Sequence, residues 1–291
     1  MPLSPDPTPP RTAGDPAAQD PSARGRIARH RVKLAFGLLV LWALVTLGIN
    51  SLVLAPDAPP EDLMVRGPLW GIVIAGAGML ILLLVLRRRG HGVALRAPLW
   101  GQLRLFWVPA LYLLLFLTPT LVMDLPAPRA IGMIALNTFF VGLSEELMFR
   151  GVLFPALRSR MRIWPAIWLS SVIFGLAHVS NIAITGSLAV AGAQALAATC
   201  SALVFMALLL RTGSLWPCIL FHAAWDFSLI LLTVSAPEQE SPTAVADINP
   251  LLLLAPVLLI LPNALYALWM MRHAGTDRLP GDPGRAHVAA A

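Results

Sequence analysis

The stretch AIGMIALNTFFVGLSEELMFRGVLF, residues 130–154, places two adjacent glutamates and one arginine inside an apolar run. A membrane-spanning helix needs about 20 predominantly apolar residues, and this run is long enough to supply them. A charge at the centre of a bilayer costs about 2.5–3.5 kcal/mol on insertion scales, and such residues usually face the interior of a helix bundle and mark function. The same stretch therefore predicts both a spanning helix and a functional site.

The composition of the whole chain is that of an integral membrane protein. Of its 291 residues, 57% are hydrophobic and 12% are charged, and the mean hydropathy is +0.75. A soluble domain carries about 25% charged residues. The arginines cluster at the ends of apolar runs, where they act as topology signals. We therefore expect a lipid bilayer as a partner and no nucleic acid.

Eight apolar runs follow one another along the chain, and most are long enough to span a membrane. They lie at about residues 34–55, 68–86, 105–123, 130–157, 164–181, 186–210, 214–235 and 249–271. These runs predict an all-α fold, a polytopic bundle of about eight transmembrane helices with the site in a cavity inside the bundle.

The connections between the runs alternate between arginine-rich and arginine-poor. By the positive-inside rule this pattern places both termini in the cytoplasm, and the expected location is the inner membrane of a bacterial cell. Residues 1–30, which are rich in Pro, Ala and Asp, are predicted to form a disordered cytoplasmic tail. Residues 31–273 form the expected transmembrane domain, and residues 274–291 a second disordered tail.

Few titratable residues lie within the predicted spans. Of the 15 acidic residues only Glu145, Glu146 and Asp226 do so, and of the six histidines only His178 and His222. The set is small and its chemistry is coherent, because it combines carboxylates with imidazoles. These five residues are the candidate site.

Helical geometry separates the two glutamates. Glu146 and Arg150 are four residues apart, with the acid first, which is the favourable order for an ion pair on one helix face. Glu145 is rotated by about 100° from Glu146 by the 3.6-residue period. A helix-anchoring salt bridge at a membrane edge would explain Glu146 and Arg150, but it leaves Glu145 without a local partner.

The two histidines each have a neighbour one helical turn away. FGLAH places Phe174 and His178 on one face of the fifth predicted helix, and HAAWD places His222 and Asp226 on one face of the seventh. A carboxylate that holds a histidine fixes its tautomer and strengthens it as a base. The structural alternatives are a buried core histidine at 178 and a polar pair that locks two helices together at 222 and 226.

The depths of the candidate residues are compatible with one site. Glu145 and His178 are 33 residues apart, and their midpoint falls in the arginine-rich turn RSRMR, residues 158–162. A helical hairpin about this turn carries each of them roughly 20 Å from it at 1.5 Å per residue. We therefore expect them to face one another, whereas His222 is expected several ångströms shallower.

The motifs, taken in order, resemble those of a known family. EELMFRGVLFPAL is similar to the signature E-E-x-x-x-R-G-x-L-x-x-x-L, and it is followed by F-x-x-x-H and H-x-x-x-N/D. This resembles the CAAX prenyl protease and bacteriocin-processing (CPBP) family of intramembrane glutamic endopeptidases. The resemblance covers about residues 130–235 and implies a peptide hydrolase that acts on a membrane-anchored protein or peptide.

The resemblance also implies a role for each residue. Glu145 activates a water molecule with the help of His178, His222 and Asp226 stabilise the oxyanion, and Glu146 and Arg150 support Glu145. Prenyl-processing members carry Asn at the position of Asp226, and an ionised Asp cannot donate a hydrogen bond. We therefore assign Asp226 to orienting His222, with His222 as the donor. Neither a cofactor nor a metal is implied.

Three other functions remain open at this point. Two histidines and two carboxylates are able to ligate zinc, although the H-E-x-x-H pattern is absent from the sequence. Intramembrane Glu, His and Asp also build the proton relays of transporters, but we find no internal repeat of the kind that transporters carry. The third alternative is a non-proteolytic immunity or scaffold protein with the same fold.

Overall fold

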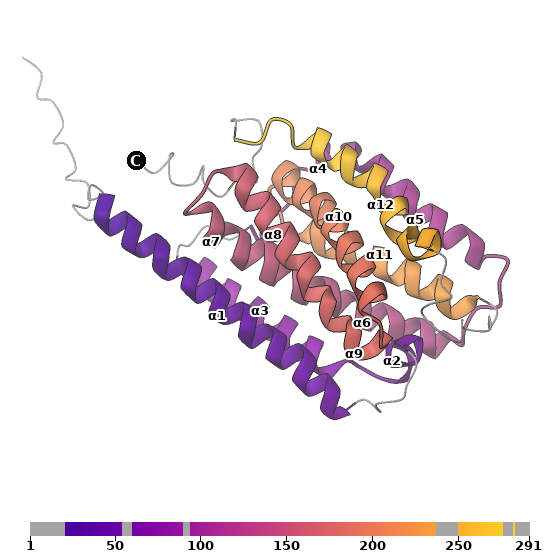
Figure 1. The fold of residues 1–291 in the computed structure, drawn as a ribbon. Coiled ribbons are helices and arrows are strands. Elements are labelled where there is room, and N and C mark those ends of the chain that lie inside the picture. Colours follow the sequence, from indigo (N-terminus) through magenta and orange to yellow (C-terminus); the bar gives the residue numbers. More distant parts are fainter. Residues whose placement is uncertain (1–20, 54–59, 90–93, 237–249, 276–281, 283–291) are drawn as a thin grey trace, which may run out of the picture.

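The computed structural model describes residues 21–53, 60–89, 94–236, 250–275 and 282. Within these residues the regular structure is helical and contains no strand. Eight helical spans are long and apolar enough to cross a membrane. The predicted all-α polytopic bundle and its number of spans are therefore confirmed (Figure 1).

Several spans consist of more than one helical segment. The first three spans are formed by α1 (Pro21–Val53), α3 (Trp70–Arg88) and the series α4 (Trp100–Leu103), η2 (Arg104–Phe106) and α5 (Trp107–Thr120). The next two are the series α6 (Pro128–Glu146), η3 (Leu147–Leu153) and α7 (Phe154–Arg158), and the series α8 (Ile163–Ala177), η4 (His178–Asn181) and α9 (Ile182–Thr185). The last three are α10 (Leu188–Thr212), α11 (Trp216–Ser235) and α12 (Pro250–Met270), and a short helix α2 (Pro60–Arg66) precedes α3.

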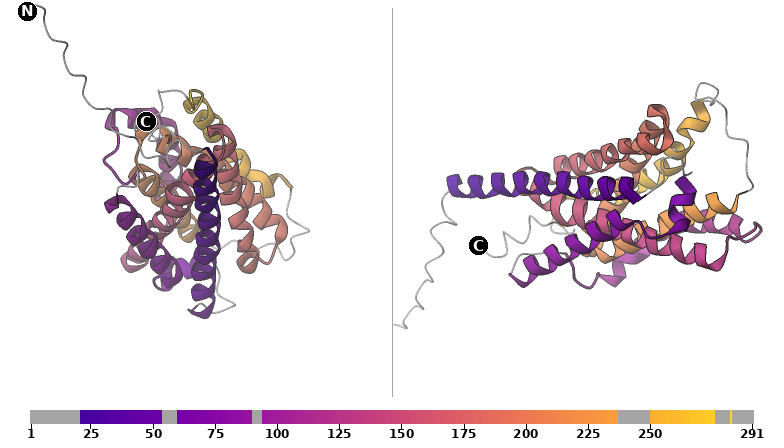
Figure 2. Two further views of the ribbon diagram at one scale, coloured as in Figure 1. Left: turned by 90° about the vertical axis from the view of Figure 1, so that its left-hand side faces the viewer. Right: turned by 90° about the horizontal axis from the view of Figure 1, so that it is seen from below.

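The helix α10 forms the centre of the bundle. In its most apolar window 67% of the residues are buried, against 11% for the first span. α10 packs against α8, α11 and α12, and α6 packs against α3 and α11. α1 lies along the outside of the bundle against α3 and η3 (Figures 1 and 2). Of the elements that carry candidate residues, η4 and α11 pack against α10, and α6 packs against α11.

Two glycines allow close helix contacts beside the candidate site. A Cβ atom on Gly142 of α6 would stand 2.8 Å from the carbonyl oxygen of Ile219 and 3.0 Å from the nitrogen of Ala223, both on α11. A Cβ atom on Gly175 of α8 would overlap Thr199 of α10. Small residues let helix backbones approach closely in membranes, so these glycines set the distances of α6 from α11 and of α8 from α10.

The ends of the chain differ in part from the expectation. The helix α1 begins at Pro21, inside the segment 1–30 that was expected to be disordered, and residues 1–20 lie outside the described part. Asp282, inside the expected tail 274–291, is buried and pairs with Arg158 through both carboxylate oxygens, at 2.9 Å and 3.1 Å. The flanking residues 276–281 and 283–291 lie outside the described part.

Candidate active site

The two adjacent glutamates stand at a change of helix geometry. Glu145 and Glu146 are the last two residues of α6, and the chain continues without a break into η3, which is a π-helix over Leu147–Leu153. π-helical turns are rare and occur frequently at functional sites. Neither the α6 boundary nor this wider turn was predicted from the sequence.

Glu146 and Arg150 form a buried ion pair, as their spacing predicts. The Nη1 atom of Arg150 donates to Oε1 of Glu146 at 2.9 Å, and the two side chains are 1% and 0% exposed. Nη2 of Arg150 donates to the carbonyl oxygen of Ala202 on α10 at 3.2 Å. The guanidinium also lies 4.4 Å from the ring centroid of Phe174 and 5.1 Å from that of Phe205. The charge of Arg150 is thus neutralised and enclosed by its neighbours.

The imidazole of His222 lies between carboxylates. Its Nδ1 atom is 2.9 Å from Oε1 of Glu146, and its Nε2 atom is 3.4 Å from Oδ2 of Asp226 and 3.9 Å from Oε2 of Glu145. A carboxylate oxygen only accepts, so Nδ1 is the donor to Glu146. A ring that carries protons on both nitrogens satisfies both sides at once. The geometry therefore favours a His222 that donates through Nε2 as well.

His222 has a second carboxylate partner besides the expected Asp226. The i, i+4 spacing brings Asp226 near Nε2, but the shorter contact is from Nδ1 to Glu146 on another helix. Gly142 lies one turn before Glu146 and contacts the α11 backbone between Ile219 and Ala223, the turn that carries His222. This close approach of α6 to α11 supplies the contact, and it also removes the expected mismatch in depth.

Aromatic rings fix the His222 ring from its faces and edges. The ring of Phe205 stacks on it at a centroid distance of 4.5 Å and an angle of 17°. Phe174 approaches it edge-on at 6.0 Å. His222 itself is only 4% exposed. Its orientation is therefore set by packing and by the bond to Glu146 together.

His178 lies where α8 ends and the 3-10 turn η4 begins. Its Nδ1 atom is 3.0 Å from the carbonyl oxygen of Phe174, and its ring lies 4.9 Å from that of Phe174. A carbonyl only accepts, so Nδ1 carries the proton and Nε2 of the neutral ring keeps a lone pair. The predicted pairing of Phe174 with His178 on one face is confirmed, and Phe174 contacts both imidazoles.

Glu145 is the partly accessible carboxylate of the glutamate pair. Its side chain is 17% exposed, and its Oε2 atom makes no hydrogen bond to any described residue. No hydrogen bond or ion pair joins it to His178 among the described contacts, although His178, His222 and Asp226 all interact with it electrostatically. Asp226 is 26% exposed. The site thus has a sealed inner part and an accessible outer part that holds Glu145 and Asp226.

A zinc site would need at least three donor side chains that converge on one point. Among the residues that the structure describes, no group of three or more His, Cys, Asp or Glu side chains is arranged to hold a metal ion.

The comparisons with known proteins agree with the motifs. Residues 127–228 match the model of the Rce1-like family, described as type II CAAX prenyl endopeptidase Rce1-like. The comparisons with curated proteins and with solved structures gave no match. The matched segment contains the EELMFRG, FGLAH and HAAWD motifs and all of the side chains that meet around His222. The resemblance predicted from the motifs is thus confirmed over residues 127–228, where the chain is similar to the Rce1-like family of type II CAAX prenyl endopeptidases.

Proposed function

We propose that this protein is an intramembrane endopeptidase that hydrolyses a peptide bond in a membrane-associated protein or peptide. The observation that carries the proposal is the arrangement of the two adjacent glutamates. Glu146 is 0% exposed and its Oε1 is held by Arg150 and His222, whereas the side chain of Glu145 is 17% exposed and its Oε2, a buried atom, has no hydrogen-bond partner among the described residues. We therefore assign Glu146 to holding the site together and Glu145 to the reaction.

Glu145 acts as the general base in this proposal. Its Oε2 has no hydrogen-bond partner among the described residues, so it is able to accept a proton from a water molecule. His178 accepts a hydrogen bond from the same water through Nε2, because its Nδ1 proton is already donated to Phe174. The two groups orient the lone pair of the water oxygen toward the substrate.

His222 acts as the donor to the oxyanion. The water oxygen forms a bond to the carbonyl carbon of the substrate, and the carbonyl oxygen takes up the negative charge. The Nε2–H group of His222 donates to this oxygen, and the two flanking carboxylates, Glu146 and Asp226, favour the ring that carries both protons. Charge-assisted hydrogen bonds are roughly twice as strong as neutral ones, and loss of one oxyanion donor typically costs about 10²–10³ in rate.

The intermediate then collapses. The bond between the carbonyl carbon and the amide nitrogen breaks, and the proton held by Glu145 passes to the leaving amine. Glu145 therefore serves first as base and then as acid, and it returns to its starting state. Arg150 and Glu146 take no part in proton transfer, because they are buried away from the accessible carboxylates.

The proposal is tested with purified full-length protein in lipid vesicles and a panel of membrane-anchored peptides, with and without lipid chains. Cleavage in H₂¹⁸O is expected to place one ¹⁸O atom in the new carboxyl group. Glu145→Gln is expected to abolish cleavage, while Asp124→Asn, which removes an exposed carboxylate from a loop, leaves cleavage unchanged. Cleavage that persists in Glu145→Gln would contradict the assignment of the base.

A further inference from the structure

The outer helix α1 contacts the end of α6 through one tryptophan. The Nε1 atom of Trp42, on α1, donates a hydrogen bond to Oγ of Ser144 at 2.7 Å. Ser144 is completely buried, and it directly precedes Glu145 in the last turn of α6. Because α1 lies outside the matched residues 127–228, this contact joins the candidate site to a part of the chain that the family match does not cover.

Trp42 lies on the face of α1 that is turned toward the bundle. Ala35 and Thr46 are buried, whereas Leu41 and Leu44 are exposed. Ala35, Trp42 and Thr46 follow one another at intervals of seven and four residues, which is the spacing of one helix face. The indole therefore reaches the interior from the side by which α1 packs against α3 and η3.

A second contact of the same indole leads to the aromatic side chains of the site. The ring of Trp42 meets that of Phe149 edge-on at a centroid distance of 5.5 Å, and Phe149 meets Phe174 at 5.0 Å. Phe174 in turn contacts the rings of His178 and His222. Since Phe149 belongs to η3, the indole touches the chain on both sides of the change from α-helix to π-helix.

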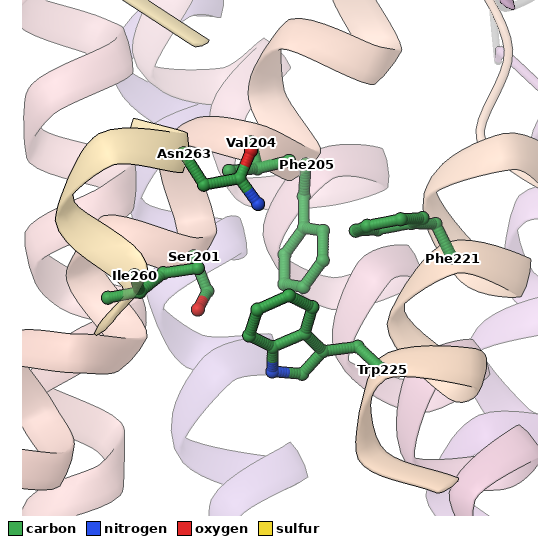
Figure 3. A pocket seen from close by; sticks show the side chains of 7 residues that line it. All are labelled: Ser201, Val204, Phe205, Phe221, Trp225, Ile260 and Asn263. Atoms are coloured by element: carbon green, nitrogen blue, oxygen red, sulfur yellow. The ribbon is translucent and has the colours of Figure 1, made fainter. Parts of the chain in front are cut away.

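The opposite side of the site is held by α10 and α11. The ring of His222 stacks on Phe205, and Phe205 packs against Phe221 in an aromatic wall between these two helices (Figure 3). Glu146 bonds to the same imidazole at 2.9 Å. The residue after Glu145 is thus anchored on α11, and the residue before it is anchored on α1.

We propose that Trp42 is a positioning residue that sets the direction of Glu145, an inference that rests on the proposed role of Glu145 as the base. Successive residues of a helix point about 100° apart, so Ser144, Glu145 and Glu146 face three directions. Anchors on Ser144 and Glu146 prevent the end of α6 from turning about its axis. Glu145, whose Oε2 makes no hydrogen bond to a described residue, takes its direction from these two anchors.

The cost of losing one anchor follows from the size of the helix. Side chains end about 5–6 Å from the axis of an α-helix, so a turn of about 10° moves a carboxylate by about 1 Å. A misplacement of about 1 Å can cost about 10² in rate. A serine hydroxyl that loses its partner also bonds back to the carbonyl one turn earlier, which often bends the helix. Loss of the indole N–H is therefore expected to lower kcat and to leave KM unchanged, because it disturbs the base and not the binding surface.

A double-mutant cycle on the full-length protein in lipid vesicles tests the inference, with the membrane-anchored peptide that the wild type cleaves fastest. Trp42→Phe keeps an aromatic ring against Phe149 and removes the N–H donor, and Ser144→Ala removes the acceptor. We expect each variant to lower kcat per folded protein by about 10- to 100-fold at unchanged KM. The double variant is expected to be no slower than the slower single variant. Trp100→Phe, the same substitution at an exposed position of α4, leaves kcat unchanged.

Hydrogen exchange of the same variants gives a readout that needs no substrate. In Trp42→Phe the backbone amides of residues 144–150 are expected to exchange faster than in the wild type, because local opening of this segment becomes easier. The amides of α10 and α11 are expected to keep their wild-type rates. Absence of cleavage in the wild type would contradict the proposed function, and the exchange rates would still test whether Trp42 holds the end of α6.

Three results would overturn the inference. The first is a wild-type kcat in both single variants or wild-type exchange of residues 144–150 in Trp42→Phe. The second is a pair of kcat reductions that multiply in the double variant, because Trp42 and Ser144 would then act independently. The third is faster exchange throughout the bundle in Trp42→Phe, since the indole would then support overall stability and not the direction of Glu145.

Discussion

Replacement of Glu146 by alanine should unfold the bundle far more readily than the same change at Glu145. In the native structure Oε1 of Glu146 accepts hydrogen bonds from both Arg150 and His222, each at 2.9 Å. Glu146→Ala removes the negative charge from between them. Arg150, which is 1% exposed, is then left buried without its counter-ion.

The size of the effect follows from the burial of the pair. Removal of one partner from a buried ion pair costs about 3–5 kcal/mol, because the remaining charge stays uncompensated. Since each 1.4 kcal/mol is a factor of ten, the folding equilibrium constant falls by a factor of roughly 10² to 4 × 10³. At about 2–4 °C per kcal/mol for a large domain, the melting temperature falls by about 6–20 °C.

The assay is thermal unfolding of the variants purified in detergent. The measured quantity is the fraction of protein that remains monodisperse after heating to each temperature. Glu145→Ala is the matched control, because it makes the same substitution one residue earlier, at a side chain without a hydrogen bond to Oε2 among the described residues. Its expected cost is about 1 kcal/mol or less. A double variant, Glu146→Leu with Arg150→Met, is expected to recover part of the lost stability, since apolar replacement of both partners of a buried pair is often close to neutral.

Equal melting temperatures for Glu146→Ala and Glu145→Ala would refute the reasoning. They would mean that the buried ion pair adds no more to the free energy of unfolding than the side chain of Glu145 does. A double variant that is less stable than Glu146→Ala would refute the second step, because it would show that Arg150 is not the group left uncompensated.

Four other outcomes are expected. Glu145→Gln should keep the wild-type melting temperature and lose peptide cleavage, which thermal unfolding and a cleavage assay measure together. Gly142→Val should lower cleavage and stability, since its side chain would push α6 away from the α11 backbone; a wild-type melting temperature would contradict this. Exhaustive chelation should leave full activity, because a carboxylate–histidine pair is able to activate water unaided; stoichiometric zinc with activity restored by its return would overturn the mechanism. A reporter fused to the C-terminus should be active in the cytoplasm, as the alternating arginine loops require.

The spans and the ion pair between Glu146 of α6 and Arg150 of η3 follow from local rules, and for this reason the sequence predicts them well. A run of about 20 apolar residues is a span wherever it occurs. Glu146 and Arg150 meet because residues four apart share a helix face, and the pairing at 2.9 Å confirms it. The same holds for Phe174 and His178, whose rings are in contact.

The contact between Glu146 and His222 depends instead on how two helices are rotated against each other. The helical period shows which residues share a face of one helix, but it does not show which neighbouring helix that face contacts. A signal for this contact was present in Gly142, one turn before Glu146, because a small residue allows the backbone of α11 to approach. The π-helix η3 has no comparable signature in its residues, since LMFRGVL contains neither proline nor a polar insertion before Arg150.

The tasks that we propose for the two adjacent glutamates are not interchangeable, because the two side chains point in different directions from one helix. The period of about 3.6 residues turns Glu145 by about 100° from Glu146. Glu146 therefore faces Arg150 and Nδ1 of His222, where its charge is used in holding the site together. Glu145 faces the accessible side, 3.9 Å from Nε2 of the same ring. A single imidazole is thus held by one carboxylate and approached by the other, and this places the proposed base and the proposed oxyanion donor on the same side of the ring.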